Sequence, residues 1–416
     1  MNDMLLLKHL NGNAMRNNLK IFVVCQHFYP ETFRINDICF ELVKRGHSVT
    51  VLTGFPNYPK GIIFDEYRGF KIRKEDIKGV NVERAFLIER GKGLLSMALN
   101  YASFAIFASI KALWLRKDYD VIFSYQLSPV TMVWPAIVMK WLIKKPLIIH
   151  CLDQWPISVT TGPIKKSSFI YKFLTKLSVW TYKQANLITI SSKSFAKYFK
   201  EDLGIDKKYI YWPSYAESEY EGIKFKKDKY FDIVFAGNIG PAQSVETIIL
   251  TANELREMKD IRFHIVGDGL SRNDCESLAK KLGLDNVKFY GFYPVEEMPN
   301  FYSSADAFMI TMADNEVVNQ TLPAKLQSYM LAGKPILGAI NGEVKDVVEE
   351  AECGACSASL DYVGLANLIK KHYKNQALLE KWSNNSKKYY EKHFNKEKSL
   401  LNFEDILYNI KNKIED

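Results

Sequence analysis

Short apolar runs alternate with segments of helical spacing along most of this chain. Residues 19–26 form a run rich in β-branched side chains, and residues 35–45 follow with apolar positions at helical spacing. Gly46 comes directly after this segment, as is typical of a helix C-terminus. Residues 48–53 form the next apolar run. A strand, a helix and a strand joined by short connections make a βαβ unit, so the pattern predicts a parallel sheet.

The same alternation recurs through both halves of the chain. In the first half it predicts helices at 130–143 and 168–184, and strands at 120–125, 146–151 and 186–191. In the second half the predicted strands are 231–236, 261–266, 286–290, 306–310 and 335–340. The chain is therefore expected to be an α/β protein with two Rossmann-like, doubly wound domains that face a central cleft.

Interruptions in the pattern set the expected domain boundaries. Residues 212–229 lack a sustained apolar period and predict a linker. The other expected parts are an N-terminal extension at 1–18, a first domain at 19–211, a second domain at 230–375, and helices at 376–416 that pack across both domains. The extension holds only a short apolar patch, without the length or cleavage site of a signal peptide.

Composition and charge narrow the classes of partner. Of the 416 residues, 47% are hydrophobic and 25% are charged, as in globular proteins, and no apolar run reaches the ~18 residues of a spanning helix. The formal net charge of +9 is spread along the chain and fits an anionic membrane surface or phosphate-bearing substrates. No zinc-finger, RNP or homeodomain pattern is present, so we expect no nucleic-acid partner. Because no apolar run is long enough to span a membrane, we expect a cytoplasmic location.

Three strand-to-helix turns in the second half carry glycine. Glycine lets a ligand approach the backbone closely, and a helix N-terminus offers free N–H groups to an anion. One such turn alone is as often an ordinary turn, but three at one sheet edge predict a bound nucleotide diphosphate. The expected donor-binding residues in these turns are Gly237, Asn238, Gly240, Gly267 and Gly291.

A fourth turn places a lysine at the start of a helix. Thr321 is a candidate helix cap, and Pro323 suits the first turn of that helix. Lys325 follows in the first turn, where a cation opposes the helix dipole. This mismatch predicts that Lys325 meets an anion, although a solvated lysine is the plainer alternative. Gly333 is expected to end the helix.

The first half supplies candidates for chemistry and for a second substrate. Asp153 lies just past the strand at 146–151, where this fold places catalytic groups. His150 lies inside that strand, which favours a core histidine. Loops after two earlier strands mix aromatic and polar groups that could line an acceptor pocket, or could equally be plain loop residues: Tyr29, Arg34, Asn57 and Tyr58.

Metal and membrane candidates are weaker. Asp118 and Asp120 form a D-x-D sequence, but they precede a strand and so are expected in a solvated turn, without a metal. Cys353 and Cys356 form a single C-x-x-C, which without a second pair favours ordinary thiols. Residues 91–117 are apolar with basic ends, which is typical of either an interfacial helix or a buried core helix.

Several strings in the chain are similar to glycosyltransferase family 4, a family of retaining enzymes with the GT-B fold. The resemblance spans residues 20–355 and is closest to a bacterial surface-polysaccharide branch of N-acetyl-L-fucosamine transferases. It is carried by CQHFYPETFRINDICFELVKRGHSVTVLTGFPNYPKG, DQWPISVTTG, FAGNIGPAQSVETI and LPAKLQSYMLAGKP. The family's basic donor pair would fall on Asn238 and Gln243, and its paired glutamates on Gln320 and Ser328.

The resemblance implies a reaction and its participants. A sugar, with N-acetyl-L-fucosamine as one candidate, would pass from a nucleotide diphosphate, expected to be UDP, to a lipid-linked oligosaccharide in O-antigen or capsule synthesis. No cofactor is implied beyond the nucleotide sugar. The donor would meet Lys325, Gln320, Thr321 and Ser328, and Asp153 would orient the acceptor or stabilise charge on the sugar. The enzyme would act at the inner face of the membrane as a peripheral protein.

Two other functions are compatible with the same pattern. A nucleotide-sugar epimerase of the GT-B fold would need no acceptor. An inactive transferase-like subunit would bind the donor without turnover, and the missing glutamate pair supports this alternative. Turnover of the donor with and without an acceptor separates the three.

Overall fold

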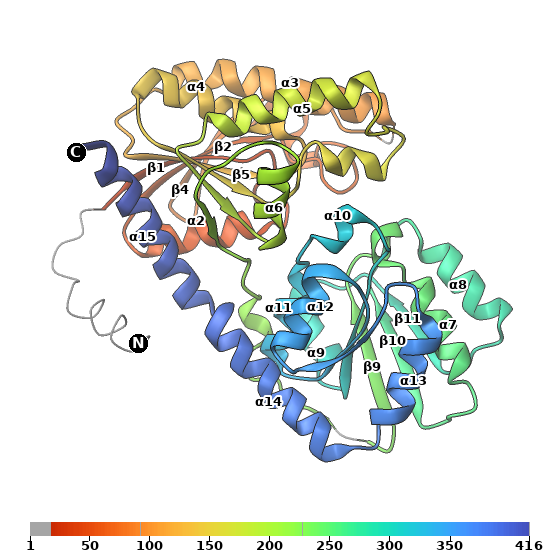
Figure 1. Cartoon of the computed structure of the whole chain (residues 1–416). Helices are drawn as coiled ribbons and strands as arrows, with labels where there is room; N and C mark the ends of the chain where they lie inside the picture. The colour runs from red at the N-terminus through yellow and green to blue at the C-terminus, as the bar shows by residue number, and fades with distance from the viewer. Residues whose placement is uncertain (1–17, 92, 227, 416) are drawn as a thin grey trace, which may run out of the picture. The chain divides into compact units, whose positions relative to one another are not determined.

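The apolar runs form two separate sheets in the computed structural model, which describes residues 18–415 except 92 and 227 (Figure 1). The chain divides into two units. The first contains residues up to 189 together with 203–210 and 403–416, and the second contains residues 190–202 and 211–402. Residues 1–17 of the expected extension lie outside the described residues.

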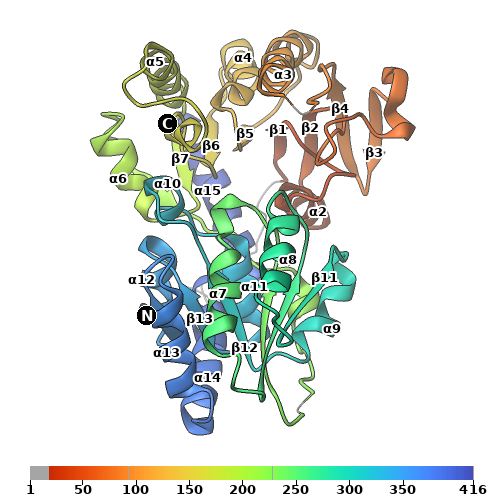
Figure 2. The ribbon, with the colours of Figure 1, turned by 90° about the vertical axis from the view of Figure 1, so that its right-hand side faces the viewer.

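The first unit is built on an eight-stranded sheet in the order β3-β4-β2-β1-β5-β6-β7-β8. Its strands are β1 (Lys20–Val24), β2 (Ser48–Gly54), β3 (Lys74–Ile77), β4 (Val80–Ala85), β5 (Val121–Gln126), β6 (Leu147–Cys151), β7 (Leu187–Ile190) and β8 (Tyr209–Tyr211). The helices of this unit between these strands are α2 (Arg34–Lys44), α3 (Leu94–Trp114), α4 (Trp134–Ile143) and α5 (Phe169–Lys183). Helix α6 (Ser194–Glu201) lies between β7 and β8 in the sequence but belongs to the second unit. Helices α3, α4 and α5 lie side by side on one face of the sheet, and α2 lies on the opposite face (Figures 1 and 2).

One part of the first sheet departs from the expected parallel arrangement. Strands β1, β2, β4, β5 and β6 pair in parallel, with Ile21 opposite Val49, but β3 pairs antiparallel to β4. Residues 74–85 were not predicted as strands, because charged side chains interrupt their apolar alternation. Lys78 and Gly79 join the two strands, both with positive φ, which permits the tight turn.

The second unit is built on a six-stranded parallel sheet in the order β11-β10-β9-β12-β13-β14. Its strands are β9 (Phe231–Ala236), β10 (Ile261–Val266), β11 (Val287–Gly291), β12 (Ala307–Thr311), β13 (Ile336–Ala339) and β14 (Gly354–Ser357). The helices of its remaining sequence are α7 (Glu246–Glu254), α8 (Arg272–Lys281), α9 (Met298–Tyr302), α10 (Glu316–Asn319), α11 (Ala324–Ala332), α12 (Gly342–Glu350), α13 (Tyr362–His372), α14 (Gln376–His393) and the first part of α15 (Lys396–Glu415), whose second part belongs to the first unit.

Alternating side chains of the central strands fill two cores, one on each face of the second sheet. Ile233 of β9 and Met309 of β12 pack with α7, α8 and α13. Val234 follows Ile233 and Phe308 precedes Met309, and both pack with α9, α11 and α12 on the other face of the sheet. A strand buried on both faces by period-two alternation identifies a doubly wound α/β unit.

The stretch expected as a linker belongs to the second unit. Trp212, Tyr215 and Tyr220 are buried there, and the Tyr220 ring stacks on Tyr302 at 4.6 Å between centroids. These aromatic side chains follow neither a helical nor a strand period, so the pattern of the sequence did not reveal their packing. The boundary between the two units falls inside α15, between Asn402 and Phe403.

Candidate functional site

Three glycine turns interlock at the carboxyl edge of the second sheet. They follow the neighbouring strands β9, β10 and β11, at the side where the strand order reverses between β9 and β12. The Gly237 amide donates to Val266 O at 2.9 Å, and the Gly267 amide donates to Gly291 O at 2.8 Å. A Cβ on Gly267 would lie 1.8 Å from Gly237 O. This close contact requires glycine at position 267, because a side chain there would collide with Gly237 O. The turns leave their backbone open at the edge of the sheet where this fold binds nucleotides.

The loop after β9 adds polar side chains to this edge. Asn238 Nδ2 donates to Gln243 Oε1 at 3.0 Å. The two predicted donor-binding residues are therefore hydrogen-bonded to each other across the turn. Gly240 lies beside them, because a Cβ at that position would be 2.7 Å from Asn238 Nδ2. Neither side chain carries charge, so this pair can orient a diphosphate but cannot neutralise it.

Helix α11 brings its first turn against the same loop. The Tyr329 hydroxyl accepts from Ala236 N at 2.8 Å and donates to Ala236 O at 3.1 Å, which ties the helix to the end of β9. Lys325, one turn earlier, lies beside Gly237, where a Cβ would be 3.0 Å from Lys325 Nζ. The lysine thus lies at the glycine edge, where the predicted anion would have to bind.

The ammonium group of Lys325 has an unusual environment. Its Nζ atom is buried and has no hydrogen-bond partner among residues 18–415 as described, and it lies 3.9 Å above the Phe235 ring. Burial lowers the pKa of Lys325 to about 7. A buried cation without a partner is costly unless a ligand anion compensates it. The nine-residue helix that carries it also offers free N–H groups at its N-terminus.

The other residues predicted around the donor lie on or near α11. Thr321 is not the helix cap: Pro323 holds that position, and the Thr321 hydroxyl donates to Val317 O at 2.8 Å. Gln320 O accepts from Ser192 Oγ at 2.6 Å. The buried Ser328 donates to Glu217 Oε2 at 3.1 Å. Glu217 therefore supplies a carboxylate where the family resemblance implied a glutamate. It was not predicted, because it lies in the segment that was expected to be a linker.

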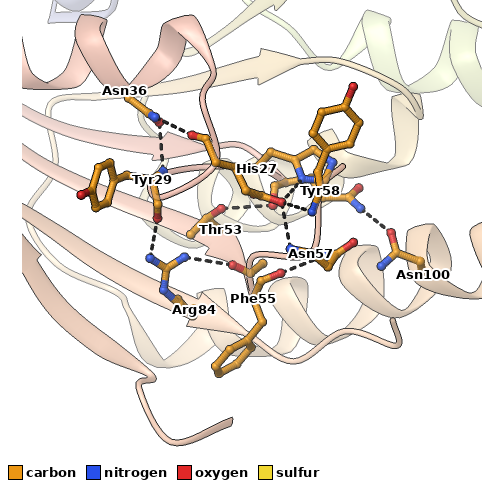
Figure 3. Close-up of polar contacts among 12 residues, drawn as sticks. His27, Tyr29, Asn36, Thr53, Phe55, Asn57, Tyr58, Arg84 and Asn100 are labelled. Carbon is orange, nitrogen blue, oxygen red and sulfur yellow. Dashed lines mark hydrogen bonds and ion pairs between the residues drawn. The ribbon is translucent and has the colours of Figure 1, made fainter. Parts of the chain in front are cut away.

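The acceptor candidates of the first unit gather around Glu31, which the sequence analysis missed. Glu31 Oε1 accepts from the amides of Asn57 at 2.9 Å and Tyr58 at 2.7 Å, and it contacts His27 Nδ1 at 3.0 Å. Figure 3 shows His27, Asn57 and Tyr58 meeting from the loops that follow β1 and β2. Glu31 belongs to the HFYPETFR string. Its acidic side chain directly after a proline is the signal in the sequence that could have indicated a site residue.

Tyr29 and Arg34 lie near this cluster. The Tyr29 backbone is fixed by Asn36 Oδ1 at 3.0 Å and by Arg84 Nη2 at 2.6 Å, while its side chain is exposed. Arg34 is the first residue of α2. Its positive charge partly opposes the rise that burial causes in the pKa of Tyr125. Both residues therefore lie at the carboxyl edge of the first sheet.

Buried oxygen atoms in the same loops lack donors. Glu31 Oε2, Asn57 Oδ1 and Gln26 Oε1 are buried and have no hydrogen-bond partner among the described residues. Each is an acceptor, so the cluster is suited to a ligand that donates several hydrogen bonds. A sugar with free hydroxyl groups is such a ligand.

Asp153 lies at the same edge of the first sheet, after β6. Its carboxylate accepts from Ser128 Oγ, at short distance, and from Trp155 Nε1 at 3.2 Å. Burial raises the pKa of Asp153, and these hydrogen bonds partly oppose the rise. Tyr101 lies within electrostatic reach of Asp153, Arg90 and Tyr58. Asp153 and Tyr58 therefore both follow parallel strands of the first sheet at its carboxyl edge.

Several weaker candidates have structural partners. His150 is buried and contacts Thr189 Oγ1 at 2.9 Å, as expected of a core histidine, and burial lowers its pKa to about 3. In the D-x-D sequence, Asp118 pairs with Lys20 at 3.2 Å and Asp120 with Lys411 at 2.9 Å. Within the described ranges no group of three or more His, Cys, Asp or Glu side chains could hold a metal ion.

Two doubly wound units, one of them with interlocked glycine turns at the carboxyl edge of its sheet, define a protein of the GT-B class. Residues 34–214 match the family described as Glycosyltransferase Family 4, and residues 217–389 match the family described as Glycosyl transferases group 1. The two matches together cover most of the chain, which belongs to the group 1 and family 4 glycosyltransferases; this confirms the resemblance to family 4 and the predicted fold.

Individual relatives are distant. WbjE of Pseudomonas aeruginosa, named as a glycosyltransferase, is 24% identical over 247 residues, and the match covers 56% of this chain and 60% of that protein. WcaI of Escherichia coli (strain K12), named for colanic acid biosynthesis, is 20% identical over 336 residues, covering 76% and 82%. HepE of Anabaena, solved in complex with UDP and glucose, matches with a TM-score of 0.67 at 17% identity over 94% of this chain and 100% of that one. The structural likeness shows the fold.

Proposed function

We propose that the chain transfers a sugar from a UDP-sugar to a lipid-linked oligosaccharide during surface-polysaccharide synthesis, with N-acetyl-L-fucosamine as a candidate sugar. The observation that carries the proposal is the buried Lys325 ammonium beside the Gly237 turn, which has no hydrogen-bond partner in the described part of the chain. A diphosphate supplies the anion that this site lacks. UDP is favoured because HepE, of the same fold, binds it, and surface polysaccharide because WcaI is named for colanic acid biosynthesis.

The residues divide the work of transfer. The donor diphosphate lies against the Gly237 and Gly267 backbone, with Lys325 neutralising charge and Glu217 accepting from ribose hydroxyl groups. The acceptor hydroxyl forms a bond to the anomeric carbon on the face from which the diphosphate departs. The bond from that carbon to the phosphate oxygen breaks, and UDP leaves with the electron pair and takes up the hydroxyl proton. The anomeric configuration is retained.

The first unit would hold the acceptor. Glu31, Asn57 and Gln26 provide unsatisfied acceptor oxygens for its hydroxyl groups. Asp153, fixed by Ser128 and Trp155, would orient the attacking group or stabilise positive charge on the sugar. A lipid-linked acceptor would place the enzyme at the cytoplasmic face of the membrane as a peripheral protein.

The inactive-subunit alternative rests on Gln320 and Ser328, which stand where the family has glutamates. The Glu217 carboxylate beside Ser328 argues against loss of function, because it returns an acid to that position. An epimerase would not need the oxygen-rich cluster around Glu31.

A panel of UDP-sugars incubated with the protein and a membrane extract tests the proposal. We expect one sugar to give UDP release that depends on the extract. The Asp153→Asn protein should bind UDP normally but turn over about 100-fold more slowly, because one preorganised charge contributes a few kcal/mol to such a transition state. A full transfer rate in Asp153→Asn would remove Asp153 from the mechanism. Donor binding without release on any acceptor would favour the inactive subunit.

A further inference from the structure

Helix α3 buries mainly small residues and exposes most of its large apolar ones. Its buried side chains are Asn100, Ser103, Phe104, Ala105, Ala108 and Ala112, of which only Phe104 is large and apolar. The outward positions recur at helical spacing and are exposed, Leu95 to 74% and Trp114 to 82%, with Leu99, Ile106, Ile110 and Leu113 between them. Globular proteins place such side chains inward and polar ones outward. This helix therefore has a second apolar face that the first unit does not cover.

The apolar surface continues over α4 and α5, which lie beside α3 in both views (Figures 1 and 2). Trp141 of α4 and Trp180 of α5 contact each other with centroids 6.2 Å apart. Among the described residues, 13 of the 22 exposed large apolar side chains lie on these three helices. The exposed tryptophans of the described chain, Trp114, Trp141 and Trp180, are all among them. Tryptophan is the residue that collects at membrane–water interfaces.

The positive charge of the chain is concentrated in the sequence segment that contains these three helices. Residues 90–183 hold 13 of the 56 basic residues and 3 of the 47 acidic ones. That segment therefore carries a formal charge of +10 and the rest of the chain one of −1. The composition suggested that the excess of positive charge is spread along the chain, but this excess belongs to the one segment at 90–183. Lys172 and Lys176 are exposed on α5 between Phe169, exposed to 84%, and Trp180.

We propose that the outward residues of α3, α4 and α5, here called the α3–α5 face, dock the protein on an anionic lipid bilayer. The apolar side chains enter the boundary between headgroups and acyl chains, and the lysines meet lipid phosphates. The positive charge excludes a second copy of the chain as the preferred occupant, because a symmetric dimer would bring two basic faces together. This proposal rests on the proposed function in one respect: the lipid-linked acceptor of that reaction is the reason for the protein to bind a lipid surface.

Helix α3 lies on the bilayer in this arrangement and does not cross it. By length and composition it could span a membrane, and 28% of its apolar window is buried in the described structure. That buried side packs against β2, β4 and α4, so the helix cannot be surrounded by lipid without leaving the unit.

The start of α3 connects the face to the acceptor loops. A small open pocket there is lined by Pro59, Arg90, Gly91, Gly93, Leu94 and Met97. Pro59 follows Tyr58, the predicted acceptor residue whose ring lies 5.6 Å from the Arg90 guanidinium. A lipid-linked saccharide held by the bilayer would therefore reach the Glu31 cluster along the end of α3.

Flotation of the full-length protein with vesicles tests the α3–α5 face. Wild-type protein should bind vesicles of phosphatidylethanolamine and phosphatidylglycerol at least about tenfold more strongly than phosphatidylcholine vesicles. The double variants Leu113→Ser with Trp114→Ser, and Lys172→Glu with Lys176→Glu, should each lose about tenfold in binding to the anionic vesicles.

Matched controls on α13 separate the face from general surface effects. Val363→Ser removes an exposed apolar side chain and Lys370→Glu reverses an exposed charge, and both proteins should bind vesicles as the wild type does. Thermal unfolding and UDP affinity should stay unchanged in all variants, because the substituted residues are exposed and lie outside the donor site.

Three results would overturn the proposal: wild-type protein that fails to float, α3–α5 variants that float normally, or a wild-type dimer that these variants convert to monomers. A protein that floats but binds no UDP would instead contradict the proposed function and leave the docking surface standing.

Discussion

The Nζ atom of Lys325 is buried above the Phe235 ring, and its charge has no partner among the described residues. The sequence singled out this residue through its position in a first helical turn, where a cation is unfavourable, and its role at a bound anion stays a prediction. It could not show that the side chain reaches Gly237, because that contact depends on how α11 packs on β9. Glu31 was missed for a similar reason, since its bonds to Asn57 and Tyr58 join separate loops.

The lowered pKa of Lys325 makes donor binding depend on pH. In the free protein the pKa is about 7, and a bound diphosphate favours the charged lysine and raises that pKa. Binding therefore takes up a proton above pH 7, and UDP affinity should fall as pH rises, by up to about tenfold per unit. Titration calorimetry with UDP between pH 7.5 and 9 measures this slope.

Variants of two lysines complete this prediction. Lys325→Gln should weaken UDP binding by about 30-fold near neutral pH, equal to about 2 kcal/mol for a charge-assisted hydrogen bond, and should remove the pH slope. Lys345→Gln, in α12, should keep both affinity and slope. The same slope in Lys325→Gln as in the wild type would show that another group takes up the proton.

Among the elements, the strands and turns of the second unit were predicted most fully. Strand β10 begins and ends at the predicted residues 261 and 266, and the three glycine turns meet at one edge because β9, β10 and β11 are neighbours in a parallel sheet. The antiparallel hairpin of β3 and β4 was not predicted, because its strands are short and charged. For α3 the sequence left an interfacial helix and a buried core helix open, since a helix apolar on all sides does not reveal which side is covered.

Substitution of one glycine tests the interlocked turns. In Gly267→Ala the new Cβ would meet Gly237 O, and the φ of 142° is unfavourable for alanine, so β9 and β10 must separate at their ends. We expect UDP affinity to fall at least about 100-fold, since the diphosphate loses its shaped backbone. Gly283→Ala is the matched control, because Gly283 also has positive φ but nothing lies within 4 Å of its Cβ position. Equal UDP affinities for the two variants, measured by calorimetry, would show that the turns are not part of the donor site.

For the whole molecule, the sequence predicted two doubly wound units and their family, and the comparisons confirm both. The repeated βαβ pattern was sufficient for the architecture because each strand is bounded by clear turn signals. The sugar and the acceptor could not be predicted, because hydroxyl recognition depends on loop geometry. The division of the chain inside α15 could not be predicted either, since one continuous helix carries no signal of it.

Analysis of the reaction product tests the central claim most directly. The purified full-length protein is incubated with a UDP-sugar, with and without a lipid-linked oligosaccharide fraction, and products are followed by mass spectrometry and by proton NMR of the anomeric centre. The account predicts a lipid-linked product heavier by one sugar, with the anomeric configuration of the donor, and no new nucleotide sugar when donor is incubated alone. An inverted product, or a new nucleotide sugar formed without acceptor, would contradict it.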